Sequence, residues 1–409
     1  GFHVHFIAQD DFFDRDGLYR TLDGDFPDND RRFAFFNCAV LELGRALAPP
    51  WDVVHCHDWH TGFIPLLLRR SDQDEVYGRS RTLITIHNLA YEGIFSRDIP
   101  DAMGLPGTVF TDEGVEFWGF VNFLKAGIVY SDWVNTVSPT YALEIQTSAY
   151  GCGLDGVLRS RAGRLSGILN GLDTETWNPR RDPHLPPPPA AGTRSAKVRW
   201  KEALLEELKL FAIPRAPLIG IVSRLDDQKG FDLFAEAAEN LMKLDVQIAV
   251  LGTGMRKYHE MLLNLKARYP RRIAVSLEFS EPLAHRIYAG ADMFLMPSRY
   301  EPCGLGQMIA MRYGTVPVVR RTGGLADTVT DVSQPGGVGF VFEPYSGEAL
   351  LTAVRRAGAA YRESRVWRRV QANAARRDFS WDRAAVEYER LYRRLGRENH
   401  DASGTFSRI

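Results

Sequence analysis

The stretch Ser298–Leu325, SRYEPCGLGQMIAMRYGTVPVVRRTGGL, determines how the rest of the chain is interpreted. The apolar segment 293–296 precedes it and predicts a buried strand, after which Glu301 occupies a Pro/Gly turn. The turn leads into an expected helix whose first amides lack an intrahelical acceptor, those of Gly304, Leu305 and Gly306. A carboxylate can accept hydrogen bonds from sugar hydroxyls, whereas free helix amides favour phosphate. The stretch therefore predicts a nucleotide-sugar site.

A second predicted strand, 315–319, ends in the turn Arg321-Thr322-Gly323-Gly324-Leu325. Glycines at such a turn allow another group to approach the backbone closely, and we expect a ligand to bind against this turn. Apolar runs and helical patterns alternate through this half of the chain, which predicts a parallel α/β sheet. The other predicted strands are 218–222, 246–251 and 273–277, with helices beginning near Lys197, Phe231 and Glu281.

The loop 223–230 follows the first of these strands and carries two cations, Arg224 and Lys229. Their spacing lets both converge on one anion, where they would neutralise a diphosphate leaving group. The alternative is a structural ion pair between Arg224 and Asp226 or Asp227.

In the first half of the chain, polar residues follow two predicted buried strands. Asp58 follows the strand 52–57, and His87 and Asn88 follow the strand 82–86. Open α/β sheets bind ligands at the carboxyl ends of their strands, so these residues are candidate ligand contacts. We also expect a strand at Phe2–Ile7, helices at 31–47 and 122–130, and a strand at 133–137.

His55, His57 and His60 allow two interpretations. A metal site is one, but an H-x-H-x-x-H pattern on a strand-to-loop junction offers no single ligand face. Histidines that pack in the core or support the site are the other, and this interpretation is favoured for His55 and His60.

The composition excludes some classes of protein. Across 409 residues the formal net charge is −1, which gives no electrostatic basis for binding nucleic acid or a membrane surface. No apolar run reaches the roughly 18 residues that span a bilayer. The length favours two or three domains. The cysteines show no metal or disulfide spacing, which indicates a reducing compartment: Cys38, Cys56, Cys152 and Cys303.

The motifs EPCGLGQ (301–307) and RRTGGLADT (320–328) resemble those of the bacterial and plant starch and glycogen synthases, retaining glucosyltransferases that use ADP-glucose. The resemblance runs from Phe12 to about Leu391. Ile309 stands where the broader retaining family has a second glutamate, which resembles the synthase branch.

The resemblance implies an α/β fold of two Rossmann-like domains facing across a cleft, the GT-B type. The implied domains are an acceptor-side domain at 1–172, a nucleotide-sugar domain at 173–378, and at 379–409 a helix returning to the first domain plus a tail. The run from Trp177 to Pro189 is polyproline-like, which by itself predicts the interdomain connection. The family's early strand and K-x-G-G-L turn do not occur here, so we expect the N-terminal domain to lack at least one βαβ unit of roughly 30 residues.

The resemblance also implies roles for particular residues. By resemblance, Asp58 would position donor or acceptor glucose and His87 would lie beneath the anomeric carbon. Glu301 could act as a nucleophile; the favoured hypothesis is a front-face substitution in which Glu301 orients the donor glucose. The implied catalytic residues are Glu301, Asp58, His87, Arg224 and Lys229. The implied substrate-binding residues are Asn88, Asn170, Cys303, Gly304, Leu305, Gly306, Thr322 and Gly323. No metal or other cofactor is expected; ADP-glucose and an α-1,4-glucan are the expected partners, in the cytoplasm or a plastid stroma.

Two departures from the family pattern bear on donor recognition. Gly306 replaces a threonine, and Phe279 replaces an aromatic residue that is often tyrosine. Two alternatives stay open: another retaining GT-B glucosyltransferase, such as a sucrose synthase-like or trehalose-forming enzyme, and a catalytically impaired fragment that binds glucan or nucleotide.

Overall fold

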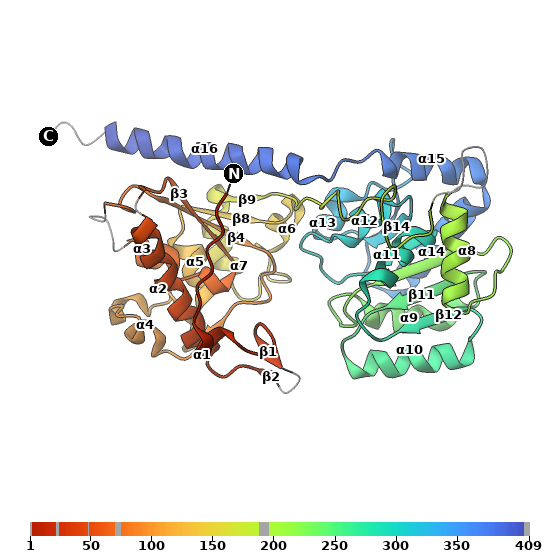
Figure 1. Cartoon of the computed structure of the whole chain (residues 1–409), viewed down its shortest axis with the longest axis horizontal. Helices are drawn as coiled ribbons and strands as arrows, with labels where there is room; N and C mark the ends of the chain where they lie inside the picture. The colour runs from red at the N-terminus through yellow and green to blue at the C-terminus, as the bar shows by residue number, and fades with distance from the viewer. Residues whose placement is uncertain (1, 22–23, 48, 70–74, 188–195, 405–409) are drawn as a thin grey trace. The chain divides into compact units, whose positions relative to one another are not determined.

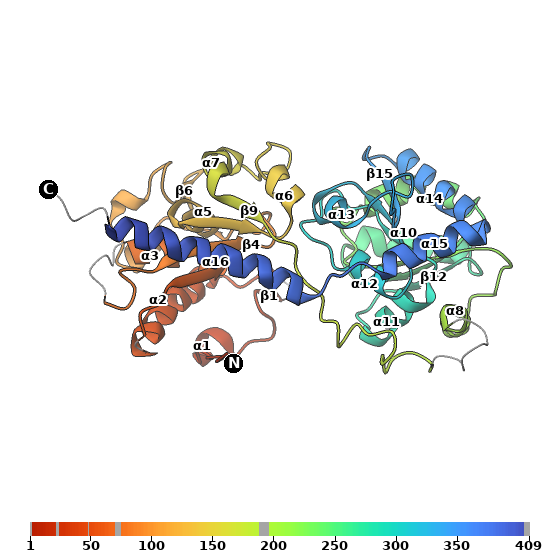
Figure 2. The same ribbon diagram turned by 90° about the horizontal axis from the view of Figure 1, so that it is seen from above.

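The computed structural model describes residues 2–21, 24–47, 49–69, 75–187 and 196–404, with side chains to Arg397. The chain forms two compact units (Figures 1 and 2). The first unit comprises 1–137, 142–168 and 386–409, and the second comprises 138–141 and 169–385.

The second unit is built on a six-stranded sheet in which every adjacent pair of strands is parallel. Its strands are β10 (Leu218–Val222), β11 (Gln247–Leu251), β12 (Ile273–Ser276), β13 (Met293–Met296), β14 (Val316–Arg320) and β15 (Phe340–Phe342). The order is β12-β11-β10-β13-β14-β15, which is the doubly wound Rossmann order. The order reverses between β10 and β13, so the loops that follow these two strands lie next to each other.

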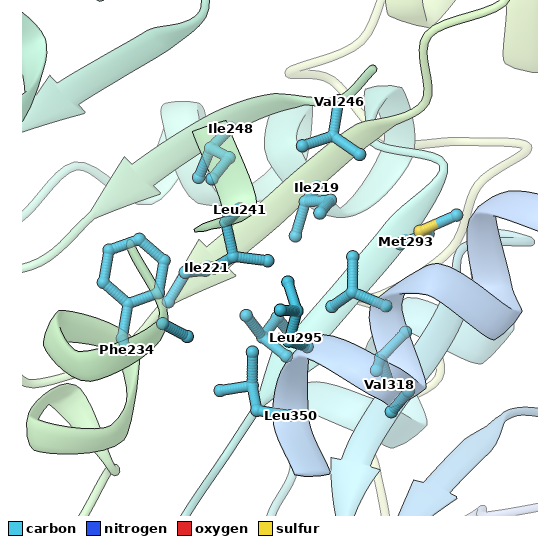
Figure 3. Packing of buried hydrophobic residues seen from close by; sticks show 14 of the residues in the cluster. Ile219, Ile221, Phe234, Leu241, Val246, Ile248, Met293, Leu295, Val318 and Leu350 are labelled. Atoms are coloured by element: carbon cyan, nitrogen blue, oxygen red, sulfur yellow. The ribbon is translucent and has the colours of Figure 1, made fainter. Parts of the chain in front are cut away.

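Helices cover both faces of this sheet because successive side chains of a strand point to opposite faces. Ile219 and Ile221 of β10 pack in the cluster that includes Phe234 of α9 and Leu350 of α14 (Figure 3). Leu218, from the opposite face, packs in another cluster, with residues of α8 and α11. The helices are α8 (Ala196–Glu207), α9 (Phe231–Met242), α10 (Arg256–Arg268), α11 (Glu281–Gly290), α12 (Gly306–Arg312), α13 (Gly323–Thr328), α14 (Gly347–Arg362) and α15 (Ser364–Ala375).

The first unit contains a four-stranded parallel sheet in the order β3-β4-β8-β9. These strands are β3 (Val53–His57), β4 (Arg81–Ile86), β8 (Trp133–Thr136) and β9 (Leu165–Gly167). Leu391 and Leu395 of α16 (Trp381–Gly404) pack in one cluster with Leu83 and Trp133 of the sheet, and the part of α16 that belongs to this unit runs along it (Figure 2).

Shorter elements surround this sheet. The helices are α1 (Asp10–Phe13), α2 (Asn29–Leu47), α3 (Ile64–Arg69), α4 (Ile99–Ala102), α5 (Phe123–Tyr130), α6 (Pro139–Glu144) and α7 (Asp155–Ser160), with 3-10 turns at Trp59–Thr61, Gly107–Val109 and Ala162–Arg164. The remaining strands are the pair β1 (Arg20–Thr21) and β2 (Gly24–Asp25) and the antiparallel trio β5 (Ile94–Phe95), β6 (Glu116–Phe117) and β7 (Phe120–Asn122).

The structure corrects three sequence-based expectations. Phe2–Ile7 forms no strand, and Phe2 and Phe6 are exposed, because an apolar pattern makes a strand only where a neighbour pairs with its backbone. The strand 53–57 is half-buried instead of buried, with only Cys56 fully covered. Trp177–Pro187 was expected to connect the two domains, but the segment belongs to the second unit, where Trp177 stacks on His285. Pro188 and Pro189 lie outside the described residues.

Along the described residues, no helix combines the length and the apolar character that a membrane crossing requires.

Candidate active site

Glu301 is buried on the turn that follows β13, and both of its carboxylate oxygens accept hydrogen bonds. The Lys229 ammonium donates to both carboxylate oxygens at 2.8 and 2.7 Å, and the Ser298 hydroxyl donates to one of them at 2.9 Å. The side chains of Glu301 and Lys229 are 6% and 18% exposed, so water screens this pair weakly. The negative charge of Glu301 is thus held in place and compensated.

The strand order brings these two residues together. Lys229 lies on the loop after β10 and Glu301 on the loop after β13, and the two strands are parallel neighbours. Asp226 shapes the first loop by accepting a hydrogen bond from the Lys229 backbone amide at 2.9 Å. Gly230 ends it with φ +75°, and a β-carbon there would lie 2.1 Å from the carbonyl oxygen of Pro297. Both loops therefore lie at the switch point of the sheet, where α/β folds of this order bind ligands.

Arg224, on the same loop, is half-exposed and makes the ion pair that was the alternative interpretation. Its guanidinium lies 3.4 Å from Asp226 Oδ2 and donates to Gln228 Oε1 at 3.1 Å. The structure therefore places Lys229, and not Arg224, against the buried carboxylate.

The turn after Glu301 leaves a row of backbone amides available. Gly304 has φ +70°, and α12 begins at Gly306. Within the described residues, no acceptor is recorded for the amides of Gly304, Leu305 and Gly306. This agrees with the free amides predicted from the sequence. A threonine at position 306 would bring its β-carbon to 2.9 Å from the Phe294 ring.

The glycines of the second turn approach protein backbone. A β-carbon on Gly323 would lie 2.0 Å from the Glu301 carbonyl oxygen, and one on Gly324 would lie 1.9 Å from that of Cys303. The Gly324 amide donates to the Glu301 carbonyl at 3.0 Å. The sequence predicted close approach of a ligand to these glycines; the close neighbour that the structure shows is the backbone of the Glu301 turn. Thr322, also buried, is the N-cap residue of the short helix α13.

Asn170 and Cys303 belong to the same site. The backbone amide of Asn170 is hydrogen-bonded to the Cys303 thiol, and burial raises the pKa of that thiol to about 12. Cys303 is therefore a neutral packing group and no nucleophile at physiological pH.

Two residues of this site were not predicted as site residues. Ser298 holds Glu301, and the buried Gln307 side chain donates to the carbonyls of Cys303 and Gly304 and to Thr328 Oγ1. Both side chains act by fixing the turn. The sequence pattern could not identify this serine and this glutamine as site residues, because their hydrogen-bond partners are mainly backbone carbonyls and one carboxylate that only the folded structure brings near them.

The first unit carries the other predicted residues. Asp58 follows β3 and His87 follows the adjacent strand β4, and Asp58 Oδ1 accepts a hydrogen bond from the His87 amide at 2.7 Å. Asp58 has φ 56° and ψ −171°, a strained backbone conformation for any residue other than glycine. Burial raises the pKa of the Asp58 carboxyl, and the His87 and Asn88 amides oppose that shift. Asn88 Oδ1 accepts from the Ala90 amide, which makes a local turn.

Several histidines lie near Asp58 and His87 in the chain and contact one another or neighbouring hydroxyls. His57 Nδ1 and His87 Nε2 are 3.0 Å apart, and His55 lies between Tyr392 and Thr85, 2.7 Å from each hydroxyl. Burial, with the neighbouring His57 and His87, lowers the pKa of His55 to about 3. Burial lowers that of His60 to about 4. His55 and His60 are therefore neutral at physiological pH, which fits the interpretation as packing and supporting residues.

The two units together define a class of protein. Each carries a parallel α/β sheet with polar residues at the carboxyl ends of its strands, and the second has the complete Rossmann order. A sucrose-phosphate synthase from Thermosynechococcus elongatus matches 90% of this chain with a TM-score of 0.57 at 19% identity, which shows the fold alone. The fold is that of a GT-B glycosyltransferase with two Rossmann-like domains, as predicted.

Comparison with known proteins narrows this class. The family described as "Starch synthase catalytic domain" matches residues 1–160, and "Glycosyl transferases group 1" matches residues 208–371. Glycogen synthase 2 of Geobacter sulfurreducens is 47% identical over 393 residues, covering 95% of this chain and 81% of that protein. A glycogen synthase of Anaeromyxobacter sp. is 48% identical over 395 residues, covering 96% and 83%.

Among solved structures, the catalytic domain of starch synthase IV from Arabidopsis thaliana, bound to ADP and acarbose, matches with a TM-score of 0.83. It is 35% identical, and the match covers 91% of this chain and 78% of that one. The chain belongs to the starch and glycogen synthase family and is a glycosyltransferase of glycogen or starch synthesis. The resemblance found in its motifs is confirmed.

Proposed function

We propose that the chain transfers glucose from ADP-glucose to the non-reducing end of an α-1,4-glucan, with retention of configuration and without a metal ion. The observation that carries this proposal is the Lys229–Glu301 ion pair at the switch point, beside the free amides that begin α12. The pair provides a fixed carboxylate and a cation, and the amides provide donors for a phosphate.

The proposed chemistry uses these groups together. The bond between the anomeric carbon and the β-phosphate oxygen breaks, and the acceptor 4-hydroxyl oxygen bonds to that carbon from the same face. The departing phosphate takes the hydroxyl proton, and ADP leaves. Glu301 orients the donor glucose and stabilises positive charge at the anomeric carbon, while Lys229 and the α12 amides, with Arg224 nearby on the same loop, stabilise the diphosphate.

The donor assignment rests on relatives. The starch synthase IV domain binds ADP, and the bacterial relatives at 47–48% identity are glycogen synthases. Gly306 and Phe279, whose ring is exposed, offer neither of the hydroxyls that the family commonly has at these positions. Recognition would then depend on the backbone amides, which Gly306 retains.

Asp58, His87 and Asn88 are proposed to contact the transferred glucose or the acceptor. The strained backbone at Asp58 supports this, since strain of this kind persists where the surrounding structure holds a functional group in place. Asn170 is proposed to hold hydroxyls of the donor glucose.

The test is a transfer assay with radiolabelled ADP-glucose and UDP-glucose, each offered to glycogen, fructose or glucose 6-phosphate. We expect label in glycogen only, a higher kcat/KM with ADP-glucose, and an unchanged rate when Mg²⁺ and Mn²⁺ are omitted. Faster transfer from UDP-glucose would overturn the donor assignment, label in fructose or glucose 6-phosphate would overturn the acceptor, and a strict Mg²⁺ requirement would overturn metal independence.

A further inference from the structure

Three potential metal ligands meet in the second unit, on elements outside the proposed transfer site. His184 lies in a turn of the segment before position 188, and Glu281 and His285 lie on α11. One ligand atom from each residue lies within 4.8 Å of the others. Glu281 and His285 are four residues apart, so they share a face of the helix. Among the described residues this is the one such cluster of His, Cys, Asp and Glu.

A second observation points to a ligand here. His285 is 1% exposed, and its Nε2 has no hydrogen-bond partner within the described part of the chain. Its Nδ1 lies 2.7 Å from Asp182 Oδ2. A proton on Nδ1 that is donated to Asp182 leaves Nε2 with a lone pair, and that lone pair is the group that binds a metal.

The surroundings fix His285 in orientation. The Trp177 ring stacks on the imidazole at 4.0 Å with an interplanar angle of 14°. The Tyr313 hydroxyl donates to Asp182 Oδ2 at 2.5 Å, and Asp182 Oδ1 accepts from the His184 amide at 2.9 Å. A carboxylate that orients a histidine through its distal nitrogen is the usual support of a histidine ligand to zinc.

We propose that His184, Glu281 and His285 bind a Zn²⁺ ion, with water as the fourth ligand. Two imidazoles and one carboxylate suit zinc, whereas Mg²⁺ and Ca²⁺ prefer oxygen ligands throughout. Tetrahedral zinc with bonds of about 2.0–2.1 Å places its ligand atoms about 3.4 Å apart. His285 is held in place by its neighbours. The exposed Glu281 side chain and the half-buried His184 side chain would therefore move to bring the ligand atoms to this spacing.

The charges around the cluster permit a cation. Asp182 and Glu281 are acidic, and the neighbouring cation, Arg286, is paired with Glu207 at 2.6 Å while donating to the His184 carbonyl at 3.0 Å. Because His184 and α11 are 97 or more residues apart in the chain, the ion would fasten the segment 173–187 to α11. Its role is structural and does not depend on the proposed transfer reaction, which needs no metal.

The experiment uses the full chain after removal of metal by dialysis, with zinc affinity measured by competition against a chromophoric chelator. We expect one tight site per chain, a zinc-dependent rise in the midpoint of thermal unfolding, no such rise with Mg²⁺, and the visible absorption of tetrahedral Co²⁺ on cobalt substitution. Glu281→Gln and His184→Asn should each weaken zinc binding at least about tenfold. Asp182→Asn should weaken it about 10–100-fold through His285.

Glu278→Gln is the matched control, because it removes the same charge three residues away on an exposed side chain and should leave zinc affinity unchanged. Glu281 is also exposed, so its variant should fold, which circular dichroism checks. The proposal is overturned if the wild-type chain binds no zinc, or if the double variant Glu281→Gln, His184→Asn binds it as tightly as Glu278→Gln does. The second result would assign the metal to other histidines, such as His55, His57 and His87.

Discussion

Asp58 in the first unit and Glu301 in the second occupy equivalent positions, each after a parallel strand of its sheet, but their charges are stabilised in different ways. Glu301 has a cation, Lys229, on both of its oxygens. Asp58 makes no ion pair among the described residues, and its carboxylate accepts hydrogen bonds from backbone amides. Its backbone has a strained φ of 56°, and burial raises the pKa of its carboxyl group.

We propose that the difference reflects what each half binds. The Glu301 site pairs opposite charges and offers free amides, which suits a charged diphosphate next to a sugar. His55 and His60, on either side of Asp58 in the chain, are half-buried imidazoles that stay neutral, and such surroundings would suit uncharged hydroxyl groups. Each of the following substitutions tests one side of this contrast.

Breaking the ion pair should have the largest effect. Lys229→Met leaves the buried Glu301 carboxylate with Ser298 as its remaining side-chain partner, and we expect the free energy of unfolding to fall by about 3 kcal/mol. Urea denaturation measures this. Adding Glu301→Gln to Lys229→Met should restore part of the loss, because no buried charge then lacks a partner.

The matched control is Arg321→Met, which breaks the exposed pair between Arg321 and Glu343, whose side chains are 46% and 70% exposed. Such a pair contributes about 0–1 kcal/mol. If Lys229→Met and Arg321→Met lowered the free energy of unfolding by the same amount, burial of the Lys229–Glu301 pair would make no contribution to stability.

Removing the charge of Glu301 should affect turnover more than nucleotide binding. Glu301→Gln keeps the shape of the side chain but loses the stabilisation of positive charge in the transition state, so we expect kcat to fall about 10²–10³-fold. ADP affinity, measured by calorimetry, should change much less. Glu343→Gln serves as the control for loss of a carboxylate. Equal losses of turnover and ADP affinity would contradict the assigned role.

The strain at Asp58 can be separated from its carboxylate. Asp58→Ala and Asp58→Gly both lose the hydrogen bond from the His87 amide, but only glycine adopts φ 56° and ψ −171° without strain. We expect Asp58→Gly to be more stable than Asp58→Ala by about 1–2 kcal/mol in urea denaturation, with transfer activity reduced in both. Equal stability would mean that the backbone there stores no strain.

The sequence predicted most strands of the second unit to within a residue or two, because buried parallel strands are continuous apolar runs. It also identified the glycine turns of the candidate site, where Gly304 and Gly323 have positive φ. It could not predict that Lys229 meets Glu301, 72 residues away, because that contact depends on the position of β10 beside β13.

The same limit explains why Phe2–Ile7 was wrongly predicted as a strand: the segment has a strand pattern, but none of the described residues pairs with its backbone. It also explains why spacing left two interpretations of Arg224 open, because the partners of Arg224 depend on rotamers. The glycines of the second turn were predicted to face a ligand, whereas the backbone that lies close to them, at Glu301 and Cys303, is remote in sequence. Local patterns thus predict elements and special backbone positions, and strand order decides which side chains meet.

The smallest expected effect is a dependence of stability on pH that arises in the first unit. The pKa of His55 is lowered to about 3 from an ordinary value near 6.5, so below pH 6.5 the unfolded chain takes up a proton that the folded chain does not. Stability is therefore lost as the pH falls from 6.5 towards 3. Allowing for partial exposure, we expect His55 to account for about 1 kcal/mol of the loss between pH 7 and pH 5.

Urea denaturation of the wild-type chain and of His55→Gln at both pH values measures this share, since glutamine keeps polar contacts to Thr85 and Tyr392 but does not titrate. Hydrogen exchange assigns the loss to a unit: amides of β3 and β4 should lose protection at pH 5, after correction for the intrinsic exchange rate, and those of β10 and β13 should not. If the free energy of unfolding had the same pH dependence in wild type and His55→Gln, His55 would carry the same charge in the folded and unfolded chain. That result would contradict a neutral His55 imidazole in the folded first unit.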